Sequence, residues 1–591
     1  MRKVSVLRRF LIWRIKHMSQ RNFIMILSVI IGVLAGLGAV VIKNGVHLIK
    51  ELLTSNIVAN YQNYLFFFLP AIGILIAVLY IRFVARQHVG HGIPSVLFAI
   101  SRSHGVIKRH NIFSSIFTSV FTVGFGGSVG LEGPTVATGA AIGSNLGQLF
   151  RLNYKQITLL LGLASAAAMS AIFKSPIAAV VFAIEVIMID LTMASLIPLL
   201  IASVTGVLTS YFFLGQAVMY PLELGVSFTL KDIPYYILLG LLAGLVSVYF
   251  TKMYIFVESS FARINIWYIK WITGGVILGI LIFFFPSLYG EGYDAVNSCL
   301  QGDYSPLFNN SLFYGLQDEI IMVFILFLLI IFFKAIATSV TFGAGGIGGI
   351  FAPTLFMGAF TGLFFTTFLK YLGVNHLSAS NFALVGMGGL IAGVLHAPLT
   401  AVFLIAEITT GYQLFVPLMV TATISYATIK IFVKNSVYTH QLARRGELIT
   451  HHKDKAILSM MTVNKLIERD FKTVTPDDKL GDLVKVISDS KRNIYPVIED
   501  DGTFCGIVVL DDIRHIMFKP ELYDETTVSS MMFMPGTSID PEESMEEVAR
   551  KFQETRNYNL PVLKDGKYIG FISRANVFSE YRKLLRDFSD E

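Results

Sequence analysis

Long apolar runs alternate with short polar segments over most of this chain. Four of the runs, at 22–42, 64–84, 234–250 and 321–339, approach or reach the ~20 residues with which an α-helix crosses the hydrocarbon core of a membrane. The pattern therefore predicts an α-helical protein with several membrane spans. After about residue 449 the polar residues return to the spacing of an ordinary soluble α/β sequence.

The same change of pattern predicts how the chain divides. We expect a basic N-terminal segment at 1–21, a membrane domain at 22–449, and two related soluble domains at 457–518 and 525–585.

The soluble tail contains an internal repeat. The segment RNIYPVIEDDGTFCGIVVLDDIR at 492–514 resembles RNYNLPVLKDGKYIGFISRANVF at 556–578. Each copy has two apolar strands joined by a polar hairpin that contains Gly502 or Gly566, and each follows a segment with helical apolar spacing. The tail is therefore predicted to hold two β-α-β-β-α units.

The membrane part repeats as well. Residues 130–143 align with 349–362 at six identical positions, and a second pair, 173–185 and 395–407, follows in the same order with a proline, an Ala-Val pair and a final glutamate in each copy. Close packing of helices through small residues would explain one such segment. Two corresponding pairs instead favour a transporter-type site where the repeats meet.

The first repeat pair has the composition of an anion site. In GLEGPT at 130–135 and GGIFAPT at 348–354, glycine lets the backbone approach a ligand, and proline near a helix start removes an N–H that would lack a partner. The remaining N–H groups and the positive end of the helix dipole favour an anion. A carboxylate inside a membrane domain is functional by default, which makes Glu132 a candidate.

Charge is distributed unevenly over the 591 residues. Residues 1–449 carry 27 Lys and Arg against 14 Asp and Glu, whereas 450–591 carry 20 against 26. The first 21 residues hold seven basic residues and no acidic one, so the N-terminus is predicted to be cytoplasmic. The basic excess flanks apolar runs and does not indicate nucleic acid. Cys299 and Cys505 fall in different domains, so neither a disulfide framework nor a metal cluster is expected.

Four motifs in the membrane part carry a resemblance to a known family. They are GHGIP at 90–94, GLEGP at 130–134, GGIFAP at 348–353, and Tyr438 in KNSVYTHQLARRG. With them the chain resembles the CLC chloride channels and chloride/proton antiporters, and its tail resembles a pair of CBS domains. The resemblance implies an α-helical polytopic membrane protein with inverted-repeat topology, plus a cytoplasmic α/β CBS-pair domain. It also implies a homodimer in the cell membrane, with both termini cytoplasmic and one pore per subunit.

The resemblance further implies a gate and an anion-binding set. Glu132 would be the gating glutamate, whose carboxylate competes with a chloride or other small anion for the outer site. The implied anion-binding residues are His91, Gly92, Leu131, Gly133, Ile350, Phe351 and Tyr438, mainly through backbone N–H groups and the Tyr438 hydroxyl.

Several positions depart from the family pattern, and those of His91 and Val186 bear on the transport mechanism. His91 stands where chloride-selective relatives usually have Ser, and a neutral imidazole donates one hydrogen bond while its charged form adds charge. Whether His91 acts on the anion or only the loop backbone matters stays open. Val186 follows Glu185 at the position of the internal proton acceptor of antiporters, so this position is substituted. Glu185 has a counterpart in Glu407, and both are interpreted as capping or pairing residues of the repeat.

The tail offers two incomplete nucleotide half-sites. In CBS pairs a Ser or Thr and an Asp after the last strand hold phosphate and ribose. Ser573 fits in the second copy, but Asn576 replaces the Asp, while the first copy offers Asp512 with Val509 at the hydroxyl position. Two alternatives stay open, namely sensing of ATP, ADP or AMP and a structural dimerisation module. No cofactor is required.

These observations predict passive, channel-like chloride conduction through a glutamate-gated pore. A chloride/proton antiporter is the first alternative. A CBS-regulated divalent-cation channel is an alternative of another class, but it would need acidic residues along the path. No nucleophile–base pair supports an enzyme.

Overall fold

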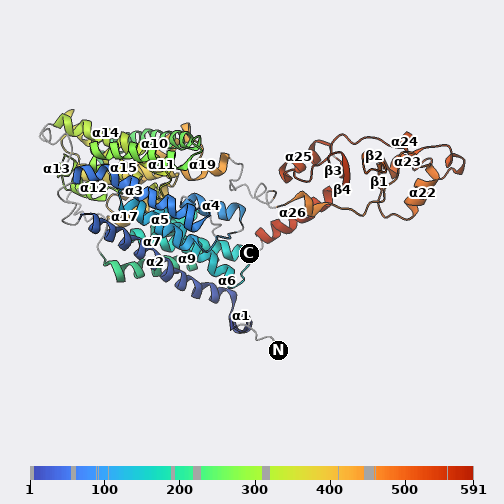
Figure 1. The fold of residues 1–591 in the computed structure, drawn as a ribbon, viewed down its shortest axis with the longest axis horizontal. Coiled ribbons are helices and arrows are strands. Elements are labelled where there is room, and N and C mark those ends of the chain that lie inside the picture. The colour runs from blue at the N-terminus through green and yellow to red at the C-terminus, as the bar shows by residue number, and fades with distance from the viewer. Residues whose placement is uncertain are drawn as a thin grey trace. The chain divides into compact units, whose positions relative to one another are not determined.

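The computed structural model describes residues 6–54, 62–87, 89–90, 92–103, 105–187, 193–216, 228–308, 320–409, 412–444, 458, 461–555 and 557–589. The chain divides into two compact units, Met1–Leu448 and Ile449–Glu591. In Figure 1 the first unit is a bundle of helices, and the second combines short strands with helices.

The described residues of the first unit are almost entirely helical. The α-helices are α1 (Val6–His17), α2 (Gln20–Thr54), α3 (Gln62–Leu79), α4 (Ile93–Arg102), α5 (Asn111–Gly124), α6 (Glu132–Leu149), α7 (Tyr154–Phe173), α8 (Pro176–Glu185), α9 (Met193–Leu214), α10 (Ile233–Ala262), α11 (Trp267–Phe284), α12 (Tyr293–Leu300), α13 (Ser305–Phe308), α14 (Ile320–Gly343), α15 (Phe351–Tyr371), α16 (Ala379–Leu395), α17 (Pro398–Ile408), α18 (Phe415–Phe432) and α19 (Val437–Arg444). A π-helical turn η2 (Tyr80–Ala85) extends α3, and two 3-10 turns are η3 (Leu230–Asp232) and η4 (Pro286–Leu288).

Within the described residues, nine helices are long and apolar enough to cross a membrane. The four runs predicted from the apolar pattern coincide with α2, with α3 and η2, with α10 and with α14, so this prediction is confirmed. Large apolar side chains such as Phe212 and Ile431 are exposed on the outer faces of these helices, which is a surface suited to lipid.

The repeated glycines explain how the central helices come so close. Helix α6 packs on α7 as its counterpart α15 packs on α16. A Cβ atom at Gly143 would lie 2.3 Å from the carbonyl oxygen of Leu160, and one at the matching Gly362 would lie 2.1 Å from that of Phe382. Both contacts are too short for any side chain, so these glycines of the repeat serve helix packing.

The second unit contains two small antiparallel sheets with short helices. Its elements are α21 (Val463–Leu466), α22 (Leu480–Ser488), β1 (Ile494–Ile498), β2 (Phe504–Val509), α23 (Leu510–Ile513), η6 (Pro520–Leu522), α24 (Val528–Met531), α25 (Met545–Thr555), β3 (Asn559–Lys564), β4 (Lys567–Ser573) and α26 (Arg574–Ser589).

The two predicted hairpins are confirmed. Strand β1 pairs with β2 and β3 with β4, each with an irregularity directly after the matching valine, Val497 or Val562. Gly502 and Gly566 have φ values of +86° and +79° in the two turns, a conformation that glycine adopts without strain. The equivalent irregularities support the internal repeat.

The predicted first strand of each unit is reduced to a single bridging pair. Val474 bridges to Val497 and Ile539 bridges to Val562, both in parallel orientation. Pro476 and Pro541 follow two residues after the bridging residues, and proline has no N–H with which to continue a ladder.

The two soluble domains within the second unit exchange their leading segments. Glu468, near the start of the first soluble domain, pairs with Phe571 of β4, and Phe533, near the start of the second soluble domain, pairs with Ile507 of β2. Phe471 and Phe504 join Ile507 and Phe571 in a shared apolar cluster. The CBS-like units therefore pack as a pair.

Candidate functional site

The two first-repeat segments meet directly. The Gly130 N–H donates to the Gly349 carbonyl oxygen at 2.8 Å, and the Gly349 N–H donates to the Gly130 carbonyl oxygen at 2.7 Å. Because α6 begins two residues after Gly130 and α15 two residues after Gly349, this bridge sets two helix starts side by side.

Both helix starts present backbone donors. The first intrahelical bonds run from Thr135 to the Leu131 carbonyl oxygen and from Thr354 to the Ile350 carbonyl oxygen, each at 3.1 Å. The N–H groups that precede them have no acceptor within their own helix. Two positive dipole ends and several amide donors therefore converge, which favours an anion without full positive charges.

The Glu132 carboxylate lies across these helix starts. Its Oε1 accepts a hydrogen bond from the Tyr293 hydroxyl at 2.7 Å, and the residue is buried. Its Oε2 has no hydrogen-bond partner among the described residues. A Cβ atom at Gly130 would lie 2.1 Å from Oε2, and one at Gly349 would lie 3.3 Å from it. The two glycines thus provide the space that the carboxylate occupies.

A small cavity lies beside the gate candidate and brings four predicted motifs together. Its lining residues are Ile93, Pro94, Gly133, Tyr254, Phe342, Gly348, Gly349, Ile350, Val437 and Tyr438. Most of these residues come from GHGIP, GLEGP, GGIFAP and the tyrosine segment, which are distant in the sequence, whereas Tyr254 and Phe342 come from α10 and α14. No acidic side chain is among these lining residues.

The Tyr438 hydroxyl is the group of the cavity that is best suited to bind a ligand. Tyr438 is buried on α19, and its hydroxyl has no hydrogen-bond partner among the described residues. A buried hydroxyl without a partner is rare, because it loses water without replacement. The donor set of Tyr438 and helix-start amides fits a dehydrated anion.

The remaining predicted anion-site residues occupy different places. Gly92 has φ +68°, and its backbone approaches Gly133 so closely that a Cβ atom would lie 2.8 Å from it. Leu131 is buried at the start of α6. The Phe351 ring packs against Phe173 and Phe182, with ring centroids 5.5 Å and 6.2 Å away. Phe351 could therefore act on an anion only through its backbone.

His91 lies outside the described residues. The hypothesis that its imidazole acts on the anion therefore stays a prediction.

The second repeat pair forms reciprocal helix caps. Glu185, at the end of α8, accepts hydrogen bonds from the N–H groups of Leu399 and Thr400 at the start of α17. Glu407, at the end of α17, accepts from those of Ile177 and Ala178 at the start of α8. The interpretation of both glutamates as caps is confirmed, and each one caps the other repeat.

Val186 directly follows the Glu185 cap. It is buried and belongs to the main apolar core of the first unit. The position that carries the internal proton acceptor in the implied antiporter pattern thus holds no ionisable group.

Two residues next to Glu132 were not predicted from the sequence. Tyr293 donates to Glu132, and the Glu291 Oε1 accepts from the Leu131 N–H at 3.2 Å. Both lie in GEGYDAV at 290–296, and the sequence of this segment alone gives no sign that its side chains reach α6. A glutamate in an otherwise apolar stretch was the available signal.

A buried lysine lies beneath the same segment. The Lys334 Nζ donates to the carbonyl oxygens of Gly290 at 3.0 Å and Leu288 at 3.4 Å, and it lies 4.6 Å from the centre of the Phe356 ring. A buried ammonium requires such partners. Lys334 therefore holds the turn that carries Glu291 through two hydrogen bonds.

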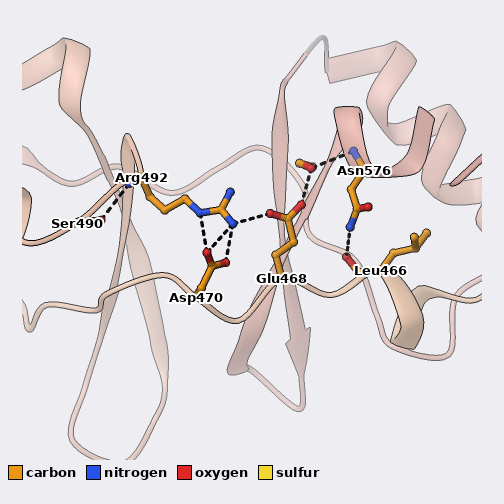
Figure 2. A network of polar contacts seen from close by, with 7 residues as sticks. Leu466, Glu468, Asp470, Ser490, Arg492 and Asn576 are labelled. Carbon is orange, nitrogen blue, oxygen red and sulfur yellow. Dashed lines mark hydrogen bonds and ion pairs between the residues drawn. The ribbon is translucent and has the colours of Figure 1, made fainter. Parts of the chain in front are cut away.

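In the second unit, the predicted nucleotide residues are bound to the chain itself. The Ser573 hydroxyl donates to the Glu468 carboxylate and accepts from the Asn576 N–H. The Asn576 side chain donates to the Leu466 carbonyl oxygen at 3.2 Å. Figure 2 shows these bonds linking Asn576, Glu468 and Leu466.

Arg492, which belongs to the first of the two soluble domains, extends this network. Arg492 forms ion pairs with Glu468 at 2.9 Å and with Asp470 at 2.6 Å, as Figure 2 shows. Its guanidinium also lies 4.7 Å from the centre of the Phe471 ring. The hydrogen bond from Arg492 lowers the pKa of the Asp470 carboxyl. The cluster carries two carboxylates against one guanidinium.

The first half-site is open. Asp512 lies in the short helix α23 and is exposed, and Val509 ends β2.

No described group of three or more His, Cys, Asp or Glu residues could hold a metal ion, and both cysteines are free thiols.

Comparison with protein families gives a match in each of the two units. The family model described as voltage gated chloride channel matches residues 72–430, and the CBS domain model matches 463–519 and 528–583.

Individual proteins show the same similarity. A putative chloride channel protein ClcB-like of Ralstonia nicotianae is 30% identical over 385 residues, which are 64% of this chain and 85% of that protein. The H(+)/Cl(-) exchange transporter ClcA of Vibrio vulnificus is 28% identical over 444 residues, covering 73% and 91% of the two chains. A solved structure of a slow cyanobacterial Cl-/H+ antiporter has a TM-score of 0.60 at 23% identity, covering 72% and 98%. This last match shows the fold, which agrees with the predicted class.

Proposed function

Since the chain belongs to the voltage-gated chloride channel family, a family that transports chloride, we propose that it carries chloride through the cavity at the paired helix starts. The observation that supports this most is the Glu132 carboxylate, whose Oε2 lies without a partner at those helix starts. In this proposal Glu132 is a tethered anion that occupies the place of a permeating one. Protonation removes its charge and releases the place.

The central anion would be held beside the gate. The Tyr438 hydroxyl and the amides near Gly133, Ile350 and Phe351 supply donors to a chloride ion, and no full positive charge is needed. The helix-start lining also argues against a divalent-cation pathway, which needs carbonyl or carboxylate oxygens.

Chloride/proton exchange is the transport mode that we favour. The passive conduction expected from the sequence has less support than its alternative, because the ClcA relative is an exchange transporter and the structural neighbour is an antiporter. A buried carboxylate that alternates between charged and neutral forms can carry the proton. Exchange would then need an inner proton route that does not use position 186.

Passive conduction is the second candidate, and Val186 favours it. An apolar, buried side chain at this position cannot accept a proton from the inner side. The ClcB-like relative is itself described as a putative chloride channel protein.

The two modes differ in whether chloride moves protons. The full chain is reconstituted into liposomes, and an outward chloride gradient is applied with proton movement recorded by a pH-sensitive dye. Exchange predicts uphill proton uptake that a protonophore abolishes. Chloride flux without proton uptake would leave passive conduction, and absence of any anion flux would contradict the proposed function.

The proposal includes an assembly and a location. We expect a homodimer with one pathway per subunit, embedded in the lipid bilayer of the cell membrane with both termini cytoplasmic. The basic N-terminal residues support this orientation. We expect the CBS pair to act structurally and without an obligatory nucleotide, since Ser573 and Asn576 are already bound within the chain.

A further inference from the structure

A glycine-flanked turn before α12 approaches the gate. Gly290 and Gly292 have φ values of +60° and +83°, and the Gly290 N–H donates to the Gly126 carbonyl oxygen at 3.1 Å. A Cβ atom at Gly292 would lie 2.5 Å from the Phe356 ring. The backbone of this turn is therefore fixed against its neighbours, and it projects Glu291 and Tyr293 towards α6.

Tyr293 binds the charged form of the gate. Its hydroxyl donates to the Glu132 Oε1 at 2.7 Å, which is a normal length for a charge-assisted bond. Such a bond weakens when the carboxylate gains a proton, because the acceptor loses its charge. Tyr293 thus stabilises the blocking state over the open one.

Glu291 acts on the residue before the gate. Its Oε1 accepts from the Leu131 N–H at 3.2 Å, one residue away from Glu132. This amide belongs to the outer anion site implied by the sequence, so the carboxylate occupies a donor that a chloride ion would use. The two carboxylates are also close enough to repel each other.

Other charged and titratable groups surround this pair on every side. Lys43 and Lys50 on α2 and Lys334 on α14 act electrostatically on Glu291, and Lys43 also acts on Glu132. Tyr438 on α19 faces Glu132 as well. The lysines favour the charged form of Glu291 and so oppose the effect of burial, which raises the pKa of this carboxyl.

We propose that Tyr293 and Glu291 are positioning residues that set the pH at which the Glu132 gate opens, and that they act in opposite directions. Tyr293 favours the charged, blocking carboxylate through its hydrogen bond. Glu291 disfavours that state through its own charge, and its carboxylate competes with chloride for the Leu131 amide. This inference rests on the proposed gating role of Glu132.

The test compares pH profiles of chloride efflux from proteoliposomes. Tyr293→Phe removes the hydroxyl and keeps the ring, so the charged gate loses one charge-assisted bond. The pH of half-maximal efflux should then rise by about one unit, which corresponds to about a tenfold change in the equilibrium. Tyr289→Phe is the matched control, because its hydroxyl donates to the Gly124 carbonyl oxygen and not to Glu132.

Glu291→Gln provides the second arm. Removing this charge leaves the lysines unopposed, so the charged gate becomes more stable and half-maximal efflux should move to lower pH. The half-saturating chloride concentration should fall, because a neutral amide competes less well for the Leu131 N–H. Asp294→Asn is the control, since Asp294 carries the same charge on the same segment but is almost fully exposed.

The outcomes separate the two levels of the proposal. In a Glu132→Gln background neither Tyr293→Phe nor Glu291→Gln should alter the pH profile. If the wild-type chain shows no anion efflux, the proposed function fails. Two results would contradict the positioning role in a chain that gates through Glu132. One is a pH of half-maximal efflux that is the same in Tyr293→Phe and Tyr289→Phe, and the other is a rise of that pH in Glu291→Gln. Tyr293→Leu repeats the first arm should Tyr293→Phe not elute as folded protein.

Discussion

Glu132 and Phe351 hold matching positions in two repeats but have different surroundings. The Phe351 ring fills an aromatic cluster with Phe173 and Phe182, whereas the Glu132 carboxylate lies over the helix starts with one oxygen unpaired. Under the proposed function, the same backbone pattern binds the anion in one copy and adds a charged group to it in the other. In that proposal, the difference between Phe351 and Glu132 is what makes the pathway gated.

The second unit gives another case in which a carboxylate takes the place of a ligand. Glu468 accepts the Ser573 hydroxyl bond and pairs with Arg492, so the predicted phosphate contact is used within the chain. Bound phosphate would have to displace a paired carboxylate and approach Asp470.

We therefore predict that nucleotides leave the stability of the full chain unchanged. Millimolar ATP, ADP or AMP should shift the melting temperature of the second unit by less than the scatter between replicates, because a ligand raises it only by binding the folded form. Glu468→Gln is the companion variant, in which the repulsive charge is removed and the shape kept. A clear nucleotide-dependent rise of the melting temperature of the wild-type chain would contradict the view that Glu468 occupies the half-site at Ser573.

At the scale of elements, glycine has two separate roles in the repeats. Gly130 and Gly349 give space to the carboxylate and form the bridge between helix starts. Gly143 and Gly362, further along the same helices, allow backbone contact with α7 and α16. The two kinds of glycine cannot be told apart in the sequence. Only the structure distinguishes the glycines that line the site from those that allow helices to pack.

Gly362→Ala should destabilise the membrane domain. The added methyl group would meet the backbone of Phe382 at 2.1 Å, and backbone cannot move aside as a flexible side chain can. Overpacking of this kind costs about 1–3 kcal/mol or more. Thermal unfolding in detergent measures it. Gly38→Ala is the control, since its nearest contact is a Thr138 methyl group at 3.3 Å, and equal melting of the two variants would contradict the packing role.

Much of the element structure could be predicted because it depends on local pattern. Apolar runs set the membrane helices, and paired hairpins with Gly502 and Gly566 set the soluble sheets. The reciprocal caps of Glu185 and Glu407 also followed from the repeat. The hydrogen bonds of Glu291 and Tyr293 could not be predicted in this way. They join segments about 160 residues apart through side chains whose directions the sequence leaves undetermined.

At the scale of the whole molecule, the membrane unit combines two helix starts, one cavity and a chain-borne anion. The cavity draws its lining from several segments that are distant in the sequence, so the site exists only when the two repeats are packed against each other. The transport mode is a property of this whole assembly. It depends on whether protons reach Glu132 from both sides, and a single buried Val186 cannot determine that alone.

The central claim is that Glu132 gates the chloride pathway by changing charge, and one measurement tests it most directly. Chloride efflux from proteoliposomes is recorded against pH for the wild-type chain and for Glu132→Gln, which mimics the neutral gate. The account predicts that wild-type efflux rises as the pH falls, because protonation releases the helix starts. It predicts that Glu132→Gln efflux is high and independent of pH, with no proton movement coupled to chloride. A Glu132→Gln profile that follows the wild-type pH dependence would contradict the account.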